Sequence, residues 1–126
     1  MGPGPTTPLQ ATGGALAVAG TFASLALFLA LTAHIAARNV LGDVAARNAL
    51  AVGAPPAAVA VIVTALDLPP WLGIGCALVI DGLLVARLYG VGRRLGAYIT
   101  FIHAVVSVIL GAIVVSLWLL IRSAPG

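Results

Sequence analysis

The sequence contains no lysine and no glutamate. Its charged residues are arginines and aspartates alone, and they make up 7% of the 126 residues, against 62% that are hydrophobic. So apolar a composition leaves too little polar surface for a water-soluble domain of this size. The sparse arginines also lack the density of a nucleic-acid-binding surface. We therefore expect a single-domain integral membrane protein that does not bind nucleic acid.

Cysteine is scarce as well. Cys76 is the only one, which excludes an intramolecular disulfide and a Cys-x-x-Cys redox pair. It lies in an apolar run, where a free thiol behaves as a small hydrophobic side chain. The histidines, His34 and His103, and the one acid within an apolar run, Asp81, fall on separate segments and do not form a recognisable metal site. We expect no metal and no cofactor.

Long apolar runs are what the sequence does contain. Each is long enough to cross the hydrocarbon core of a bilayer as a helix, and together they cover about residues 15–37, 44–66, 71–89 and 95–121. Residues 1–14 are uncharged and rich in glycine, proline and threonine, so they are expected to be a flexible tail, as are residues 123–126. The predicted fold is an all-α, up-down-up-down four-helix bundle in the membrane, formed by residues 15–122.

Local signals refine the first half of the bundle. Gly42 is placed to end the first helix in a left-handed turn, and Asp43 to cap the second by accepting hydrogen bonds from its free amides. Pro55 and Pro56 lie inside the second run, where they remove backbone donors and clash with the preceding turn. We predict a kink there. It would serve either as a bend that fits the packing or as a break that lines a binding site.

Small side chains line one face of the first run. The alanines recur at alternating steps of four and three residues, at Ala19, Ala23, Ala26, Ala30, Ala33 and Ala37. Small residues let a neighbouring helix approach closely, which matters in lipid because no hydrophobic force drives helices together there. We expect this face to be a helix contact.

The arginines indicate the topology. Four arginines lie at the first and third connections, and a fifth lies near the end of the third run. They are Arg38, Arg47, Arg93 and Arg94, and Arg87. By the positive-inside rule both connections are cytoplasmic and these arginines are interfacial anchors. Both termini and Asp67, in the middle connection, would then be outside. The expected location is the cell membrane, in which the chain is a multi-pass protein.

Asp81 is the most informative single residue. A charge at mid-membrane is costly, so this side chain should face other helices and be neutral, paired or hydrated. Counted from the third connection, Asp81 and His103 lie at a similar depth of roughly 12 to 14 Å. Adjacent antiparallel helices would bring them together. The predicted contact joins a strip of Gly73, Ala77 and Asp81 to a strip of His103, Ser107 and Gly111.

Two interpretations of this polar pair stay open. In the first, Asp81 and His103 hydrogen-bond to fix the helix register, which contributes less than about 2 kcal/mol. In the second they exchange protons, because histidine changes charge near neutral pH. His34, near the end of the first run, would extend such a proton path, and Ser107 lies one turn from His103.

Asp81-Gly82, Ala86-Arg87 and Gly96 resemble part of the signature of CDP-alcohol phosphotransferases. That resemblance would imply Mg²⁺-dependent phosphoryl transfer, but Thr100 and Ala104 stand where those enzymes have further aspartates, and the metal needs several carboxylates. The length and span number also resemble small multidrug-resistance transporters, which depend on a glutamate in the first helix. This chain contains no glutamate. We therefore expect no enzymatic activity.

Residues 32–44, TAHIAARNVLGDV, resemble small four-span haloarchaeal membrane proteins without an assigned function. The resemblance implies an archaeal protein whose first connection is available to a partner or to lipid phosphates. We expect a non-enzymatic membrane component, either a structural or accessory subunit or a self-associating bundle. Its partners would be the lipid bilayer and another membrane protein or a second copy. The alternative is a small oligomeric transporter or proton-coupled carrier that uses Asp81 and His103.

Overall fold

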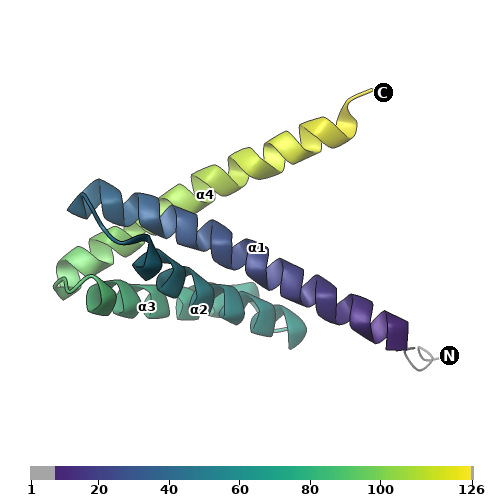
Figure 1. The fold of residues 1–126 in the computed structure, drawn as a ribbon, viewed down its shortest axis with the longest axis horizontal. Coiled ribbons are helices and arrows are strands. Elements are labelled where there is room, and N and C mark those ends of the chain that lie inside the picture. Colours follow the sequence, from purple (N-terminus) through teal and green to yellow (C-terminus); the bar gives the residue numbers. More distant parts are fainter. Residues whose placement is uncertain (1–7, 126) are drawn as a thin grey trace.

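The structure, a computed structural model, describes residues 8–125, and within that range it contains four α-helices and no strand. Their bounds are Pro8–Leu41 for α1, Ala46–Ala65 for α2, Pro70–Leu88 for α3 and Arg93–Ser123 for α4 (Figure 1). All four are long and apolar enough to cross a membrane. The predicted all-α fold of four helices is confirmed.

The first helix begins earlier than the sequence suggested. Residues 8–14, expected to belong to a flexible tail, are helical and start at Pro8. Proline suits the first turn of a helix, where its missing N–H would have no partner in any case. The rest of that expected tail, residues 1–7, lies outside the described residues, as does Gly126 at the other end.

Left-handed residues end three of the helices. Gly42 follows α1 with a φ of 85°, as predicted, and Gly90 follows α3 with a φ of 64°. After α2 the same position is occupied by Asp67, with a φ of 53°. There the amide of Leu68 donates to the carbonyl oxygen of Val63 at 2.9 Å, so the last turn of α2 closes in a Schellman motif.

Of the two predictions about α2, the cap at Asp43 is wrong and the kink at Pro55 and Pro56 is not tested. Asp43 does not cap the helix: α2 begins at Ala46, its N-cap residue is Ala45, and no side chain bonds to the free amides. The capping position directly precedes the first helical residue, so Asp43 lies too far upstream to serve. Pro55 and Pro56 do lie inside α2, which continues through both as one helix. The kink predicted there stays a prediction.

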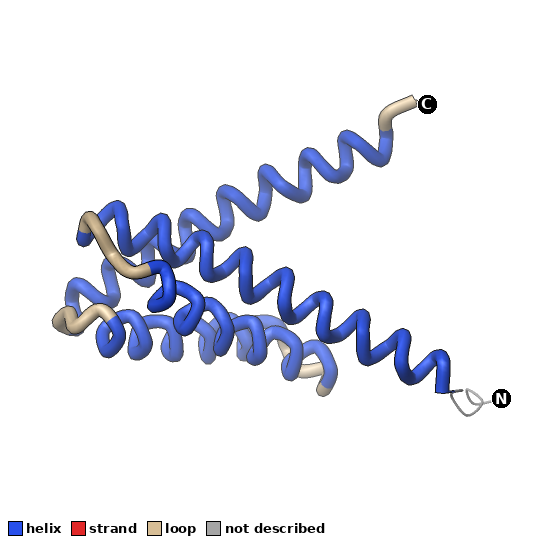
Figure 2. The backbone as a smooth tube through the Cα atoms, viewed as in Figure 1, coloured by secondary structure: helices blue, strands red, loops and turns tan. Residues whose placement is uncertain are grey.

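The helices form a ring in which α1 and α3 each pack against α2 and α4. The α1–α2 and α3–α4 connections lie at one end of the molecule, and the α2–α3 connection and both described chain ends lie at the other (Figures 1 and 2). The first end, here called the arginine end, carries five exposed arginines, namely Arg38, Arg47, Arg87, Arg93 and Arg94. Near it, Asn48 Nδ2 of α2 donates to the carbonyl oxygen of Leu88 at 3.5 Å.

The closest backbone approach joins α1 to α2. A Cβ on Gly53 would lie 2.5 Å from the amide nitrogen of Ala30 and 2.7 Å from the carbonyl oxygen of Ala26, so only glycine fits. Farther along the predicted alanine face Ala33 and Ala37 are buried as well, whereas Ala19 and Ala23 are exposed. The face is therefore a helix contact only in the half of α1 that lies toward the arginine end.

The outer halves of α1 and α4 have mostly exposed side chains. At about 1.5 Å per residue α2 and α3 are roughly 30 Å long, which matches a hydrocarbon core, whereas α1 and α4 are longer by roughly two thirds. Figure 1 shows α1 and α4 crossing and then diverging toward the chain ends. Every described side chain from Ala112 to Pro125 is exposed. The bundle is thus packed at the arginine end and open at the other.

Candidate functional site

Close packing of α3 against α4 positions the site. A Cβ on Gly96 of α4 would lie 3.1 Å from the Cβ of Ala86, and one on Gly82 of α3 would lie 3.6 Å from Oγ1 of Thr100. Glycine on alternate helices lets the two backbones approach in one antiparallel register. The same register brings together Asp81 and His103, the polar pair predicted from the sequence.

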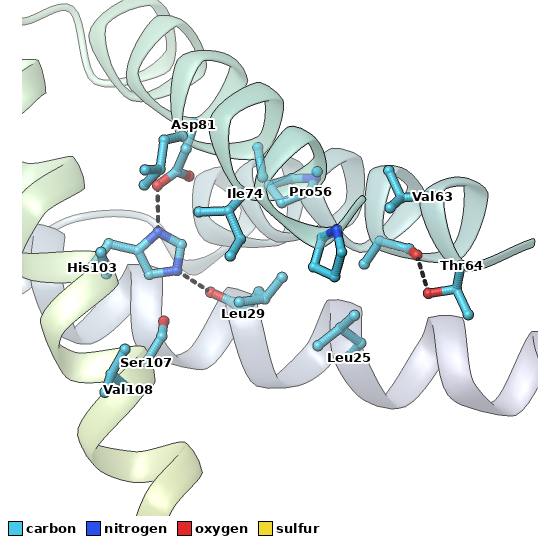
Figure 3. Close-up of a pocket in the computed structure, with 16 residues that line it drawn as sticks. Leu25, Leu29, Pro56, Val63, Thr64, Ile74, Asp81, His103, Ser107 and Val108 are labelled. Carbon is cyan, nitrogen blue, oxygen red and sulfur yellow. Dashed lines mark hydrogen bonds and ion pairs between the residues drawn. The ribbon is translucent and has the colours of Figure 1, made fainter. Parts of the chain in front are cut away.

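Asp81 and His103 form a direct, buried contact. His103 Nδ1 lies 2.6 Å from Oδ2 of Asp81, and both residues are only 4% exposed. On the opposite side of the imidazole, Nε2 lies 3.1 Å from the carbonyl oxygen of Leu29 in α1 (Figure 3). The histidine therefore links three helices, because α4 carries the ring, α3 the carboxyl and α1 the backbone acceptor.

These contacts determine where the protons are. A carbonyl oxygen only accepts, so His103 Nε2 carries a proton and donates it to Leu29. The contact between Nδ1 and the carboxyl oxygen then needs one further proton. That proton belongs either to a carboxylic acid beside a neutral imidazole or to an imidazolium beside a carboxylate. In both arrangements the pair shares one proton and has no net charge, which suits an apolar interior.

A hydroxyl chain extends the network along α1 and α4. Ser107 Oγ donates to Oγ1 of Thr32 at 2.8 Å, and Thr32 in turn donates to the carbonyl oxygen of Leu29 at 3.1 Å. Thr32 is fully buried, and Ser107 lies one turn beyond His103 on α4. Leu29 is thus the acceptor on which both the histidine and the threonine converge.

A cavity of about 480 Å³ opens directly beside the pair. All four helices line it, and it runs from Asp81 and His103 toward the α2–α3 connection, where Thr64 and Pro70 form its far end. Its walls are apolar, with Leu25, Pro56, Val63, Ile74 and Val108 among them (Figure 3). Polar groups other than Thr64 lie at the inner end, called here the floor, which comprises Asp81, His103 and Ser107.

The rest of the predicted α3–α4 contact is not found. Gly73 of α3 faces α2, where a Cβ would lie 3.1 Å from Cγ2 of Val63, and Gly111 of α4 faces Phe28 of α1 at 3.8 Å. Ala77 lines the cavity. The two strips meet only at Asp81 and His103, because α4 turns away from α3 beyond the pair and the cavity occupies the space between them.

Several buried polar atoms have no hydrogen-bond partner within the described part of the chain, namely His34 Nδ1, Asp81 Oδ1, the Tyr89 hydroxyl and Thr100 Oγ1. His34, predicted to extend a proton path, makes no hydrogen bond to the pair. Tyr89 lies just beyond the last residue of α3, at the arginine end. Burial raises the pKa of its phenol, and the Asp81 carboxyl raises it further when it is ionised.

Comparison with known proteins places the chain in a family. A family model matches residues 12–125, which include all of α2, α3 and α4 and most of α1. The chain belongs to DUF7473, a family of unknown function. No curated protein and no solved structure matches it. The DUF7473 match spans every residue of the polar network but assigns none of them a role.

Part of the network of this DUF7473 member was visible in its sequence and part was not. Asp81, His103 and Ser107 stand out as polar side chains in apolar runs. The Leu29 carbonyl carries no sequence signal, because every residue has one. Thr32 has only its helical spacing from Leu29 as a signal, since a threonine in an apolar helix commonly bonds to its own backbone, as Thr21 and Thr64 do here.

Proposed function

We propose that the chain is a multi-pass protein of the cell membrane, with the arginine end in the cytoplasm and both termini outside. The support is the set of four long apolar helices and the placement of five arginines at one end of the molecule. At the other end Arg122 stacks on the Trp118 ring, 4.7 Å from its centroid, which suits an interfacial anchor. The absence of lysine and the likeness of residues 32–44 to haloarchaeal proteins favour an archaeal membrane.

Within that membrane the proposed role is non-enzymatic: a structural or accessory subunit of a membrane assembly, or a bundle that associates with itself. The observation that carries this role is the outer segment of α4, residues 112–123, which is apolar and exposed on every side. Five consecutive side chains there, Leu117 to Ile121, are each more than half exposed. Support for a non-enzymatic role comes from the cavity, in which Asp81 is the only carboxyl group among the lining residues.

Cysteine cross-linking in native membranes tests this role. In a Cys76→Ala background, Ile121→Cys places a thiol on the outer segment of α4, and Leu83→Cys places one on α3 at comparable exposure, 74% against 67%. We expect a short bifunctional thiol reagent to link the α4 thiol to a second copy or to another polypeptide, and to leave the α3 thiol unlinked. A chain that stays monomeric at both positions would contradict the proposed role.

The cavity favours a second candidate, a small oligomeric transporter or proton-coupled carrier that uses Asp81 and His103. Its support is that an apolar cavity of about 480 Å³ ends on a buried pair that shares one proton. Infrared difference spectra between about pH 5 and 8, where histidine exchanges protons, test it. A carboxyl band that changes with pH and vanishes in Asp81→Asn is expected of a carrier, and a band that does not change would exclude a proton-coupled one.

A further inference from the structure

Every proton at the cavity floor is already used in a hydrogen bond. His103 Nε2 donates to Leu29, the second proton of the pair lies between Nδ1 and Asp81 Oδ2, and the Ser107 hydroxyl donates to Thr32. What remains unpaired is a set of lone pairs. Asp81 Oδ1 has no partner among residues 8–125, and Ser107 Oγ keeps acceptor capacity beyond the bond that it donates. The floor therefore holds unpaired acceptors, of which Asp81 Oδ1 is enclosed by protein atoms, and no free donor.

The acceptor character of Asp81 Oδ1 does not depend on where the shared proton sits. If Asp81 is ionised, Oδ1 is a carboxylate oxygen, and if it is protonated on Oδ2, Oδ1 is a carbonyl oxygen. Figure 3 shows one carboxyl oxygen of Asp81 on His103 and the other turned away from the ring. A buried acceptor without a partner is costly, and a ligand that donates a hydrogen bond would remove that cost.

The cavity walls restrict the rest of the ligand. They are apolar apart from Thr64 at the far end, and neither arginine nor histidine other than His103 is among the lining residues. An anionic head group would meet lone pairs with no cation to balance it, and a cationic one would add a charge to a pair that is already neutral. A volume of about 480 Å³ falls within the range of small-molecule sites, about 300 to 1,000 Å³.

We infer that this cavity binds a neutral, single-chain amphiphile whose head group donates a hydrogen bond, such as a long-chain alcohol. The head lies at Ser107 and, after a small shift of the Asp81 side chain, donates to Asp81 Oδ1, and the chain lies along the apolar walls. The inference rests on the membrane placement and on the cavity of the second candidate function, but not on transport or on subunit association. Binding in detergent micelles can therefore fail or succeed independently of cross-linking and of proton exchange.

Photolabelling of the purified full chain in micelles tests the inference. Three probes share one diazirine-bearing alkyl chain and differ only at the end, which is an alcohol, a carboxylate or a methyl group, and mass spectrometry locates the labelled residues. We expect the alcohol to label cavity residues such as Val63 and Ile74. The methyl-ended probe should need about fivefold more ligand for the same labelling, which corresponds to one net hydrogen bond, and the carboxylate more still.

Three variants complete the test. Ala77→Leu fills the cavity without removing any group of the polar network and should abolish the labelling, whereas Val79→Leu, on the same helix but 63% exposed and not among the lining residues, should leave it unchanged. Asp81→Leu should remove the preference for the alcohol over the methyl-ended probe. Equal labelling by all three probes, stronger labelling by the carboxylate, or labelling that survives Ala77→Leu would overturn the inference, even if Asp81→Leu fails to fold.

Discussion

His103 bridges Asp81 and Leu29, with Nδ1 2.6 Å from Asp81 Oδ2 and Nε2 3.1 Å from the Leu29 carbonyl oxygen. A single imidazole thus joins α3, α4 and α1 where the bundle changes from packed to open. On the arginine-end side of it, glycines and alanines hold the helices together. On the other side the helices line a cavity, and α4 turns away from α3. The pair is therefore both a polar contact between α3 and α4 and the polar end of the cavity.

Because the pair shares a proton, Asp81→Asn and Asp81→Ala should lower the free energy of unfolding by different amounts. Asp81→Asn keeps a hydrogen bond, since its amide N–H can donate to the Nδ1 lone pair of a neutral His103. Asp81→Ala leaves Nδ1 buried without a partner and should lower the free energy of unfolding by about 1 to 3 kcal/mol. Unfolding in mixed micelles with increasing SDS measures both. If the two variants lose the same stability, the assigned protonation is wrong.

Removing the Ser107 hydroxyl should lower the free energy of unfolding by less than Asp81→Ala does. Ser107→Ala deletes the bond that Ser107 donates to Thr32 but leaves the Thr32 hydroxyl bonded to Leu29, so the expected loss is about 0.5 to 1.5 kcal/mol. Ser116→Ala on the exposed outer part of α4 is the matched control and should leave the unfolding free energy unchanged. A loss as large as that of Asp81→Ala would mean that Ser107 supports the pair in a way that these contacts do not explain.

The contact of α1 with α2 should not tolerate one added methyl group. Gly53→Ala puts a Cβ 2.5 Å from the Ala30 amide nitrogen, so the backbones must separate, and we expect a loss of about 1 to 3 kcal/mol in the same unfolding assay. Gly75→Ala is the control, because no atom lies within 4 Å of its added Cβ. This change should be neutral or stabilising by about 0.5 to 1 kcal/mol, since alanine favours a helix interior. Equal effects of both changes would contradict the close packing described here.

The sequence predicts the helices and the central pair because both depend on simple periodic rules. Equal depth on antiparallel helices is enough to bring Asp81 to His103. It is not enough to predict that Gly73 turns to α2 and Gly111 to α1, because the divergence of α4 depends on the crossing of long helices. The failure of Asp43 as a cap has a local cause: the connection runs to Ala45 before α2 begins. The Leu29 carbonyl was unpredictable, since backbone acceptors look alike in any sequence.

The central proposal is that the chain crosses the membrane four times, with the Asp81–His103 pair turned toward the other helices. In a Cys76→Ala background, single cysteines at Ala45, Leu68 and Gly92 place a thiol in each of the three connections between α1 and α4. A membrane-impermeant maleimide is predicted to label Leu68→Cys in intact cells, and Ala45→Cys and Gly92→Cys only after permeabilisation. Labelling of all three in intact cells, or release of the protein by an alkaline wash, would contradict the proposal.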